Sequence, residues 1–482
     1  MSPKNRPTRQ KNEPVIPDPY LPGAGSADYT VAHYDLDLEY KLATNRLDGR
    51  ALLRATALVP LQRLELDLGD LQVVRVGVEG KRARFTHRQG RLSVVLPGPV
   101  AAGVRVELDI RYGGYPHPLD GTWGEVGWEE LTDGVLVAGQ PNGAPSWFPC
   151  NDHPSQKSTY RIRVSTDAGY RALCNGELVE HARRASRESW TYVQREPMAT
   201  YLATVQIGRY NLHRLPEPAG GGSGARHAAP LRIPAQFVAV GAHLAPAAHA
   251  ALTRMPEMMQ AFIEAFGPYP FESYGVVVAD DDLEIPLEAQ TLCILGRNHL
   301  SLEWESQRLI AHELSHQWFG NSLTVARWDD IWMHEGFACY AEWIWSEASG
   351  GAAAQAHARE AWTRLGRLPQ DLCVGDPGPE KMFDDRVYKR GALALHALRV
   401  GLGDQRFFGM LKDWTRRKRH DSITYRQFVA HVEAHAPEGF RAKAFLKPWL
   451  FQEGLPDFPA PVTAAGLPSG AGGAGAAQPT QT

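Results

Sequence analysis

The sequence predicts a multidomain fold, in which an N-terminal all-β domain precedes a mainly helical domain of the α+β class. The chain has 482 residues, 43% of them hydrophobic, which is enough for two or three domains with large cores. Between residues 29 and 212, apolar and polar residues alternate in short runs separated by Gly, Pro and Asn, as is typical of β-strands. After residue 245, apolar residues recur at helical spacing.

Short β-strands are expected throughout the first domain, which we place at residues 27–212. Those with the clearest pattern are expected at residues 31–40, 64–68, 104–112, 160–164, 190–193 and 200–207. Residues 1–26 are rich in Pro, Gly and charge, so we expect a disordered N-terminal tail. Residues 213–230 contain a Gly-rich run and are expected to form a linker or loop.

The second domain is expected at residues 231–457, before a low-complexity C-terminal tail at residues 458–482. Its expected elements are a helix at 245–266, a Val-rich strand at 273–279, a helix at 306–320, a helix from about 330 to 350, and helices at 388–401, 405–416, 425–434 and 442–453. Gly320 offers a C-terminal stop to the helix before it, and Asp329 and Asp330 offer N-cap side chains to the next helix.

Charge and cysteine content exclude several classes of protein. The net charge of −3 gives no bulk attraction to nucleic acid or to an anionic membrane. No run approaches the roughly 18 apolar residues of a transmembrane helix, and residues 1–20 lack the apolar stretch of a signal peptide. The five cysteines are scattered, without a Cys-x-x-Cys pair. We therefore expect a cytoplasmic protein with reduced thiols that binds neither nucleic acid nor membranes.

The run His312-Glu313-Leu314-Ser315-His316 carries the strongest chemical signal. Histidines at positions i and i+4 lie on one helix face, about 6 Å apart along the axis, and can bind one metal ion together. Glu335 follows nineteen positions after His316, which is enough chain for a turn and a second helix. Two histidines, one carboxylate and one open position are typical of catalytic zinc. We predict one zinc ion per chain, bound by His312, His316 and Glu335, with Glu313 as the general base that activates water.

Several segments together resemble a known family. They are residues 312–321 (HELSHQWFGN), 328–338 (WDDIWMHEGFA), 140–144 (QPNGA), 147–154 (WFPCNDHP) and 387–391 (VYKRG). Over residues 29–455 the chain resembles the zinc aminopeptidases of the aminopeptidase N and leukotriene hydrolase type, which are gluzincins. The resemblance implies a saddle-like N-terminal β domain and a thermolysin-like, mainly helical zinc peptidase domain. It also implies that the C-terminal helical domain of longer relatives is missing.

The resemblance implies roles for further residues. Tyr388 is expected to donate a hydrogen bond to the oxyanion that forms during hydrolysis. Glu288 is expected to pair with the α-ammonium of the substrate, and Gln140 to reach the same amine through its amide oxygen. The segment Ile285-Pro286-Leu287-Glu288-Ala289 replaces the family pattern Gly-Ala-Met-Glu-Asn, so the shape of the first specificity pocket stays open. Asn142 replaces an acidic residue of many relatives, which leaves more of the amine binding to Glu288.

Two carboxylates are candidates for orienting a ligand histidine through its other ring N–H. Asp330 matches an acidic position ahead of the third ligand. Glu342 lies seven residues after Glu335, on the same helix face. An ordinary helix cap or salt bridge explains each residue equally well.

The predicted function is a zinc-dependent aminopeptidase that hydrolyses the N-terminal peptide bond of peptides. Gln140 and Glu288 would close one end of the cleft, so that only the first peptide bond of a substrate with a free N-terminus reaches the zinc. Three alternatives stay open: an endopeptidase in which Glu288 takes no part, a non-catalytic scaffold, and an epoxide hydrolase that uses the same zinc. The oligomeric state, the preferred N-terminal residue and the biological substrate also stay open.

Overall fold

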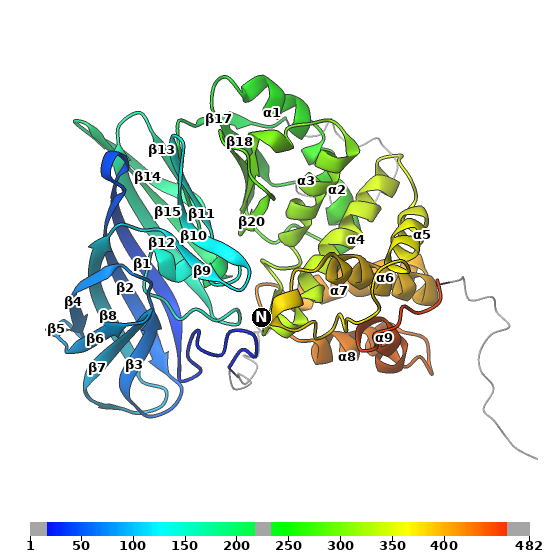
Figure 1. The fold of residues 1–482 in the computed structure, drawn as a ribbon, viewed down its shortest axis with the longest axis horizontal. Helices are drawn as coiled ribbons and strands as arrows, with labels where there is room; N and C mark the ends of the chain where they lie inside the picture. Colours follow the sequence, from blue (N-terminus) through cyan, green and yellow to red (C-terminus); the bar gives the residue numbers. More distant parts are fainter. Residues whose placement is uncertain (1–16, 217–232, 460–482) are drawn as a thin grey trace, which may run out of the picture.

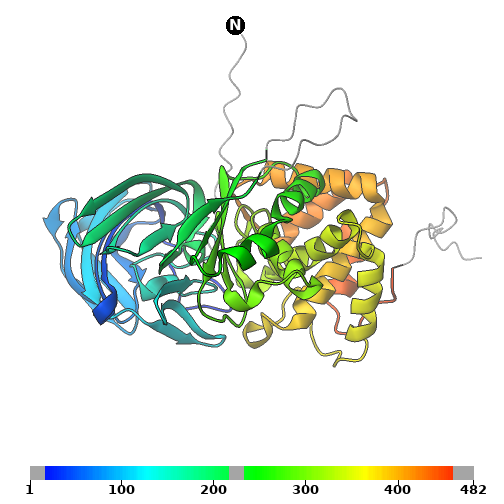
Figure 2. The same cartoon turned by 90° about the horizontal axis from the view of Figure 1, so that it is seen from above.

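The computed structural model describes residues 17–216 and 233–459, and it shows a β-rich domain beside a mainly helical domain (Figure 1). This architecture confirms the predicted fold class. Seen from above in Figure 2, the two domains lie end to end along the long axis of the molecule. Among the described residues, no helix combines the length and the apolar character that a membrane span requires.

An eight-stranded sheet forms the body of the first domain. In spatial order, its strands are β14 (Glu177–Arg184), β15 (Arg187–Ala199), β12 (Lys157–Asp167), β1 (Tyr29–Lys41), β2 (Arg46–Ala57), β8 (Arg105–Gly114), β4 (Gln72–Val78) and β5 (Lys81–Arg82). β1 and β12 pair in parallel, with Leu36 opposite Ile162, and the other neighbours pair antiparallel. Side chains two positions apart on β1, such as Leu36 and Leu38, are buried, as the alternating sequence predicts.

Two smaller sheets complete the first domain. The three-stranded sheet consists of β3 (Leu61–Asp67), β7 (Arg91–Val100) and β6 (Phe85–Arg88). The five-stranded sheet consists of β13 (Arg171–Cys174), β16 (Val205–Gly208), β11 (Gly134–Ala138), β10 (Gly124–Leu131) and β9 (Pro118–Gly121). β11 leads into the short 3-10 helix η2 (Ala144–Ser146), so this sheet positions the segment that contains Gln140.

The second domain combines a mixed five-stranded sheet with a helical body. In spatial order, the strands are β17 (Asn211–Arg214), β18 (Ala235–Val240), β19 (Ser273–Ala279), β21 (Leu292–Gly296) and β20 (Leu287–Ala289). The helices are α1 (Ala245–Leu252), α2 (Met255–Phe266), α3 (Trp304–His316), α4 (Trp332–Ala348), α5 (Ala354–Leu365), α6 (Asp385–Leu402), α7 (Asp404–Arg417), α8 (Tyr425–His435) and α9 (Ala442–Leu450). The short strands β22 (Thr324–Val325) and β23 (Ser422–Ile423) pair in parallel and tie the segment after α3 to the segment before α8.

Several helices differ in their bounds from the prediction; α9, for example, ends at Leu450 instead of residue 453. Residues 245–266 form α1 and α2 instead of one helix, because Pro256 lacks the N–H that a helix interior needs and stands in the first turn of α2. α3 ends at His316 instead of residue 320. The chain turns away there, and Gly320 adopts a φ of 130°, a conformation that favours glycine.

Strand pairing and hydrogen bonds tie residues near the predicted domain boundaries to the second domain. β17 pairs with β18, so the chain already belongs to the sheet of the second domain at Leu212. Residues 17–26, which were expected in a disordered tail, make hydrogen bonds to both domains. Asp18 Oδ2 accepts a hydrogen bond from the backbone N–H of Trp328 at 2.7 Å, and the backbone N–H of Gly25 donates to Asp67 Oδ2 at 2.9 Å. The other parts of the expected tails and linker lie outside the described residues, at 1–16, 217–232 and 460–482.

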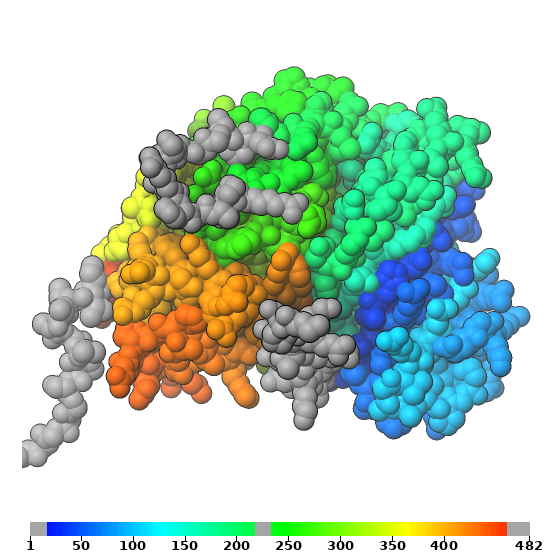
Figure 3. All heavy atoms as spheres, turned by 180° about the vertical axis from the view of Figure 1, so that it is seen from behind, coloured from blue at the N-terminus to red at the C-terminus, as the bar shows by residue number. Residues whose placement is uncertain are grey.

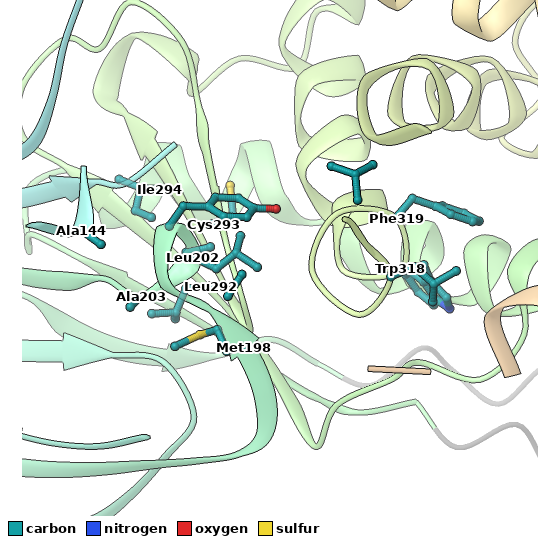
Figure 4. Packing of buried hydrophobic residues seen from close by; sticks show 14 of the residues in the cluster. Ala144, Met198, Leu202, Ala203, Leu292, Cys293, Ile294, Trp318 and Phe319 are labelled. Carbon is teal, nitrogen blue, oxygen red and sulfur yellow. The ribbon is translucent and has the colours of Figure 1, made fainter. Parts of the chain in front are cut away.

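The two domains share a continuous apolar core. Figure 4 shows buried side chains of both domains packed together, among them Ala144, Met198, Leu202, Ala203, Leu292, Cys293 and Ile294. Polar contacts extend this interface, since Lys157 Nζ donates to the carbonyl oxygens of Asn321 and Ser322 at 2.9 and 2.8 Å. Asn175 Nδ2 also donates to the carbonyl of Gln290 at 2.7 Å. The interface therefore fixes the first domain against the segment that follows α3.

Candidate metal centre

Helices α3 and α4 pack against each other and carry the residues of the predicted metal motif. His312, Glu313 and His316 lie in the C-terminal half of α3, and Glu335 lies in the first turn of α4. Every residue from 310 to 316 is buried, so packing on several sides holds this part of α3 in place. The helix–turn–helix arrangement that the spacing predicts is therefore present.

Three possible ligand atoms converge where α3 meets α4. Glu335 Oε2 lies 3.4 Å from His312 Nε2 and 3.6 Å from His316 Nε2. The two imidazole centroids are 4.9 Å apart, and the rings are inclined by 75°. Two ligands of one tetrahedral zinc ion, each at about 2.0–2.1 Å from it, are about 3.4 Å apart. The three side chains are therefore spaced as ligands of a single ion.

The other ring nitrogens of both histidines have acceptors. His312 Nδ1 is 2.8 Å from Glu342 Oε1, and His316 Nδ1 is 3.0 Å from the carbonyl oxygen of Phe319. A carbonyl or carboxylate oxygen only accepts, so Nδ1 carries the hydrogen in each neutral imidazole. Both Nε2 lone pairs are thereby free to bind a metal ion, which is the usual way in which proteins orient histidine ligands.

Glu342 lies in a positive environment. Its Oε2 is 3.5 Å from Arg308 Nη1 and 3.8 Å from Lys389 Nζ. Burial by itself would raise the pKa of Glu342, but the charge of Lys389 and the hydrogen bond with His312 outweigh burial and hold that pKa below its usual value. Glu342 therefore remains an ionised acceptor for the Nδ1 hydrogen of His312.

Glu313 and Tyr388 flank the convergent ligand atoms. Glu313 is 4% exposed, burial raises the pKa of its carboxyl group, and its Oε2 has no hydrogen-bond partner among the described residues. Tyr388 of α6 stacks on His312, with ring centroids 6.0 Å apart. Burial also raises the pKa of the Tyr388 hydroxyl, so this group stays protonated and can donate a hydrogen bond.

β20 brings Glu288 to the same place. A carboxylate oxygen of Glu288, one of Glu313 and a ring nitrogen of His316 all lie within 4.8 Å of one another. Glu288 is opposite Cys293 in the pairing of β20 with β21. Burial, aided by the charges of Glu335 and Glu313, raises the pKa of Glu288 to about 7, and no lysine or arginine of the described chain pairs with this carboxylate. The centre thus includes a further carboxylate that has no lysine or arginine partner.

Gln140 belongs to the first domain and follows β11. Its Nε2 is buried without a hydrogen-bond partner within the described residues, and so is Oδ1 of Asn142. Such atoms are rare in native proteins and often mark places where water or a ligand completes the bonding. A Cβ on Gly139 would lie 2.1 Å from the carbonyl oxygen of Tyr201, and the Tyr201 hydroxyl donates to the carbonyl of Gly320 at 3.1 Å. These contacts hold the Gln140 segment close to the end of α3.

Asp330 does not contact a ligand histidine. Its Oδ2 accepts a hydrogen bond from the backbone N–H of Tyr425 at 3.0 Å, and it therefore stabilises the first turn of α8. Burial raises the pKa of Asp330 to about 7. Of the two carboxylates that the sequence offers for orienting a histidine, Glu342 lies against His312 and Asp330 lies elsewhere.

Sequence reasoning missed three groups around the ligands, which are Arg308, Lys389 and the carbonyl of Phe319. Arg308 precedes His312 by four positions, so its place on the same face of α3 was available as a signal. Lys389 directly follows Tyr388, but the sequence does not indicate that its side chain lies near Glu342. The Phe319 carbonyl has no sequence signal, because it depends on how the backbone turns after α3.

The fold and the centre together define a zinc-dependent metallopeptidase, since two histidines and a glutamate are spaced as metal ligands and a further glutamate lies beside them. The chain belongs to peptidase family M1. The profile of the peptidase M1 N-terminal domain matches residues 30–202, and the profile of the peptidase family M1 domain matches residues 250–449. The cofactor of this family of metallopeptidases is zinc, and the donor set of the centre fits it.

Solved structures and curated proteins agree with this assignment. An M1 zinc metallopeptidase from Deinococcus radiodurans is 30% identical, covers 92% of this chain and 99% of that chain, and has a TM-score of 0.83. Leucyl aminopeptidase from Saccharolobus solfataricus is 23% identical over 405 residues, which is 78% of this chain and 48% of that protein. Aminopeptidase B from Rattus norvegicus is 26% identical over 474 residues, which is 85% of this chain and 66% of that protein. The chain thus spans from about half to two thirds of the length of these two relatives.

Proposed function

We propose that this protein is a zinc aminopeptidase that hydrolyses the N-terminal peptide bond of peptides. The zinc would be held by His312, His316 and Glu335. When bound, it would act as a Lewis acid that polarises the scissile carbonyl and lowers the pKa of the attacking water. The names of leucyl aminopeptidase and aminopeptidase B support this activity. A variant of the Deinococcus radiodurans protein also has a structure with Tyr-Ser-Ala, a peptide described as its substrate.

The uncompensated carboxylate of Glu288 carries this proposal. It lies within 4.8 Å of groups on Glu313 and His316, yet the convergent ligand set does not include it. A substrate with a free α-amine brings the cation that the described side chains do not supply. Pairing of that ammonium with Glu288, aided by the amide oxygen of Gln140, would hold the first peptide bond beside the metal ligands.

Glu313, Tyr388 and Glu342 complete the proposed machinery. The raised pKa of Glu313 and its unpartnered oxygen suit a general base that takes a proton from water and gives it to the leaving amine. The neutral hydroxyl of Tyr388 donates a hydrogen bond to the oxyanion as its charge grows. Glu342 fixes the ring of His312 in the orientation that leaves Nε2 free.

A matched pair of substrates tests the proposal. The zinc-loaded protein is assayed with an aminoacyl amide that has a free amine and with its N-acetylated form. Acetylation removes the charge that pairs with Glu288, so we expect the acetylated form to be cleaved at least about 100-fold more slowly. Glu288→Gln should lower kcat/KM for the free amine by a similar factor. Glu284→Gln, an exposed carboxylate in the same segment, should leave kcat/KM unchanged.

Two results would contradict the proposal. Equal rates for the free and the acetylated substrate, with no effect of Glu288→Gln, would establish an endopeptidase in which Glu288 takes no part. Absence of hydrolysis with a broad panel of aminoacyl amides and longer peptides, in protein that holds one zinc ion, would establish a non-catalytic scaffold.

A further inference from the structure

We propose that Asp413, His431 and His435 form a second transition-metal site, separate from the catalytic centre. Asp413 lies on α7, and both histidines lie on α8. One ligand atom from each of the three residues falls within 4.8 Å of the other two. Figure 1 shows α7 and α8 next to each other, and Figure 3 shows this orange part of the chain at the molecular surface.

The geometry is that of a ligand set. The histidines are four positions apart on α8, so both rings lie on one face of the helix. Their centroids are 4.3 Å apart, and His435 Nε2 is 3.2 Å from Asp413 Oδ2. α7 therefore supplies a carboxylate to a histidine pair on its neighbour, as α4 does for α3 in the catalytic centre.

The hydrogen bonds of the two rings leave one lone pair on each. His431 Nε2 is 2.9 Å from the carbonyl oxygen of Met410, and His435 Nδ1 is 2.9 Å from the carbonyl oxygen of His431. Because a carbonyl only accepts, those two nitrogens carry the hydrogens of the neutral rings. The lone pairs available to an ion are then those of His431 Nδ1 and of His435 Nε2, which faces Asp413. Both rings are thus oriented by backbone acceptors in the way that histidine ligands require.

Two arginines compete with an ion for Asp413. Arg416 and Arg417 pair with its carboxylate from the same helix, but their side chains are 69% and 63% exposed. Ion pairs of such exposed groups are weak, and a guanidinium group can turn into water when an ion takes its place. His431 is fixed more firmly, since it is 9% exposed and its ring lies 5.0 Å from that of Trp414. We therefore expect a site that binds metal reversibly and more weakly than the catalytic centre.

The donor set selects the class of metal and suggests what the ion does. Two imidazoles and one carboxylate suit Zn²⁺, Ni²⁺ or Cu²⁺ better than Mg²⁺ or Ca²⁺. A bound ion would tie α7 to the C-terminal end of α8. The ring of Phe428 on α8 lies 6.0 Å from Trp332 and 5.7 Å from Phe337, both on α4. The ion would thus stabilise the packing behind the helix that carries Glu335, without taking part in hydrolysis.

Calorimetric titration of the full chain with Zn²⁺ alone, after its catalytic centre has been filled with one equivalent, tests the site. We expect a second equivalent to bind and to raise the Tm by about 1–3 °C. His435→Gln and Asp413→Asn should each weaken the second equivalent at least about tenfold and leave the first unchanged. His181→Gln is the matched control, because His181 pairs with Glu188 at 2.9 Å without a third ligand within the described residues.

A variant that is expected to bind the second zinc ion more tightly shows that weaker binding in the other variants is not caused by misfolding. Arg416→Ala combined with Arg417→Ala removes the competing cations, so the second equivalent should bind about tenfold more tightly than in the unmodified chain. The site is overturned if neither the unmodified chain nor this variant binds a second equivalent. It is also overturned if a second equivalent binds but neither His435→Gln nor Asp413→Asn weakens it.

Discussion

Two histidine pairs with the same spacing lie in the helical domain, and their surroundings differ. We call His312 and His316 the α3 pair, and His431 and His435 the α8 pair. The α3 pair is 7% and 2% exposed, and both of its Nε2 atoms face Glu335 Oε2 at 3.4 and 3.6 Å. The α8 pair lies at the outer face, and its second ring is 27% exposed. The same local spacing therefore produces a closed centre in one place and an open one in the other.

Competing charges separate the two pairs further. Glu335 has no lysine or arginine partner among the described residues, where only His312 and His316 lie against its carboxylate. Asp413 is shared with Arg416 and Arg417. A carboxylate that is already neutralised by cations gains less from a metal ion. We therefore expect burial and the absence of competing cations, more than the spacing of the histidines, to determine how firmly each pair binds an ion.

The residue after the first histidine is the third difference. In the α3 pair, Glu313 follows the first histidine, whereas Val432 follows it in the α8 pair. The acidic residue nearest in sequence to Val432 is Glu433, which is exposed. An ion at the α8 pair would therefore lack a buried base to take a proton from water. The comparison therefore leads us to expect that hydrolysis depends on Glu313 and not on the two histidines alone.

Substitution of Glu313 should have the largest effect, because it removes the glutamate that distinguishes the α3 pair from the α8 pair. Glu313→Gln keeps the shape and the metal ligands but removes the proton acceptor, so kcat should fall by about 10²–10⁴-fold while one zinc ion per chain is retained. Steady-state kinetics and elemental analysis of the same preparation measure both quantities. Glu433→Gln, the control on α8, should change neither. Substantial turnover by Glu313→Gln would remove Glu313 from the role of base.

Tyr388 distinguishes the α3 pair in a second way, because it stacks on His312. Tyr388→Phe removes only the hydroxyl that would donate to the oxyanion, so we expect kcat to fall by about 10²–10³-fold with little change in KM. Tyr115→Phe is a suitable control, since Tyr115 is 65% exposed. A rise in KM at unchanged kcat would instead make Tyr388 a residue that binds substrate.

The comparison also explains what could be predicted from the sequence. The fold class and the convergence of the α3 pair with Glu335 depend on periodicity and on spacing along adjacent helices, which are local properties. The choice between Glu342 and Asp330 could not be made in advance. Both lie within a few turns of Glu335, and only the packing of α3, α4 and α8 decides which carboxylate meets a histidine.

Long-range contacts account for the remaining differences. β17 joins the sheet of the second domain because it pairs with β18, and its own composition does not indicate this. The surroundings of Gln140 depend on the docking of the two domains, which brings Tyr201 against the segment after α3. Glu288 was found through family resemblance, since a single glutamate in a short strand carries no distinguishing pattern of its own.

Glu342 allows a smaller test of how the α3 pair is oriented. In Glu342→Gln, a neutral amide replaces the ionised acceptor of His312 and leaves Lys389 without its charge partner, so zinc affinity should fall by about 10–100-fold. Competition with a chelator of known affinity measures this change. Asp330→Asn is the matched control, because Asp330 is a partly buried carboxylate that accepts a hydrogen bond from the backbone of Tyr425 and not from a histidine. Equal losses in both variants would show that Glu342 acts through general stability.

The smallest expected effect concerns His396 of α6, a buried histidine that belongs to neither pair. Its Nε2 is 2.6 Å from Gln355 Oε1 and its Nδ1 is 3.2 Å from the Tyr340 hydroxyl, so the neutral ring is fully bonded. Burial, followed by the charge of Arg399, lowers the pKa of His396 from 6.5 to about 4. Between pH 6.5 and about 4, the unfolded chain therefore binds more protons than the folded chain. The contribution of His396 to stability is complete above pH 6.5 and is lost as the pH falls towards 4.

His396→Gln removes this titration and should make the stability less dependent on pH. We expect the free energy of unfolding to fall between pH 7 and pH 4.5 by about 2 kcal/mol more in the unmodified chain than in the variant. Urea unfolding followed by tryptophan fluorescence at both pH values measures the difference. Parallel pH dependence in the two proteins would contradict the assignment. A confirmed difference would show that burial and the charge of Arg399 outweigh the carboxylates of Glu347 and Asp404 and keep His396 neutral, whereas in the α3 pair the surrounding carboxylates outweigh burial and raise the pKa of both rings.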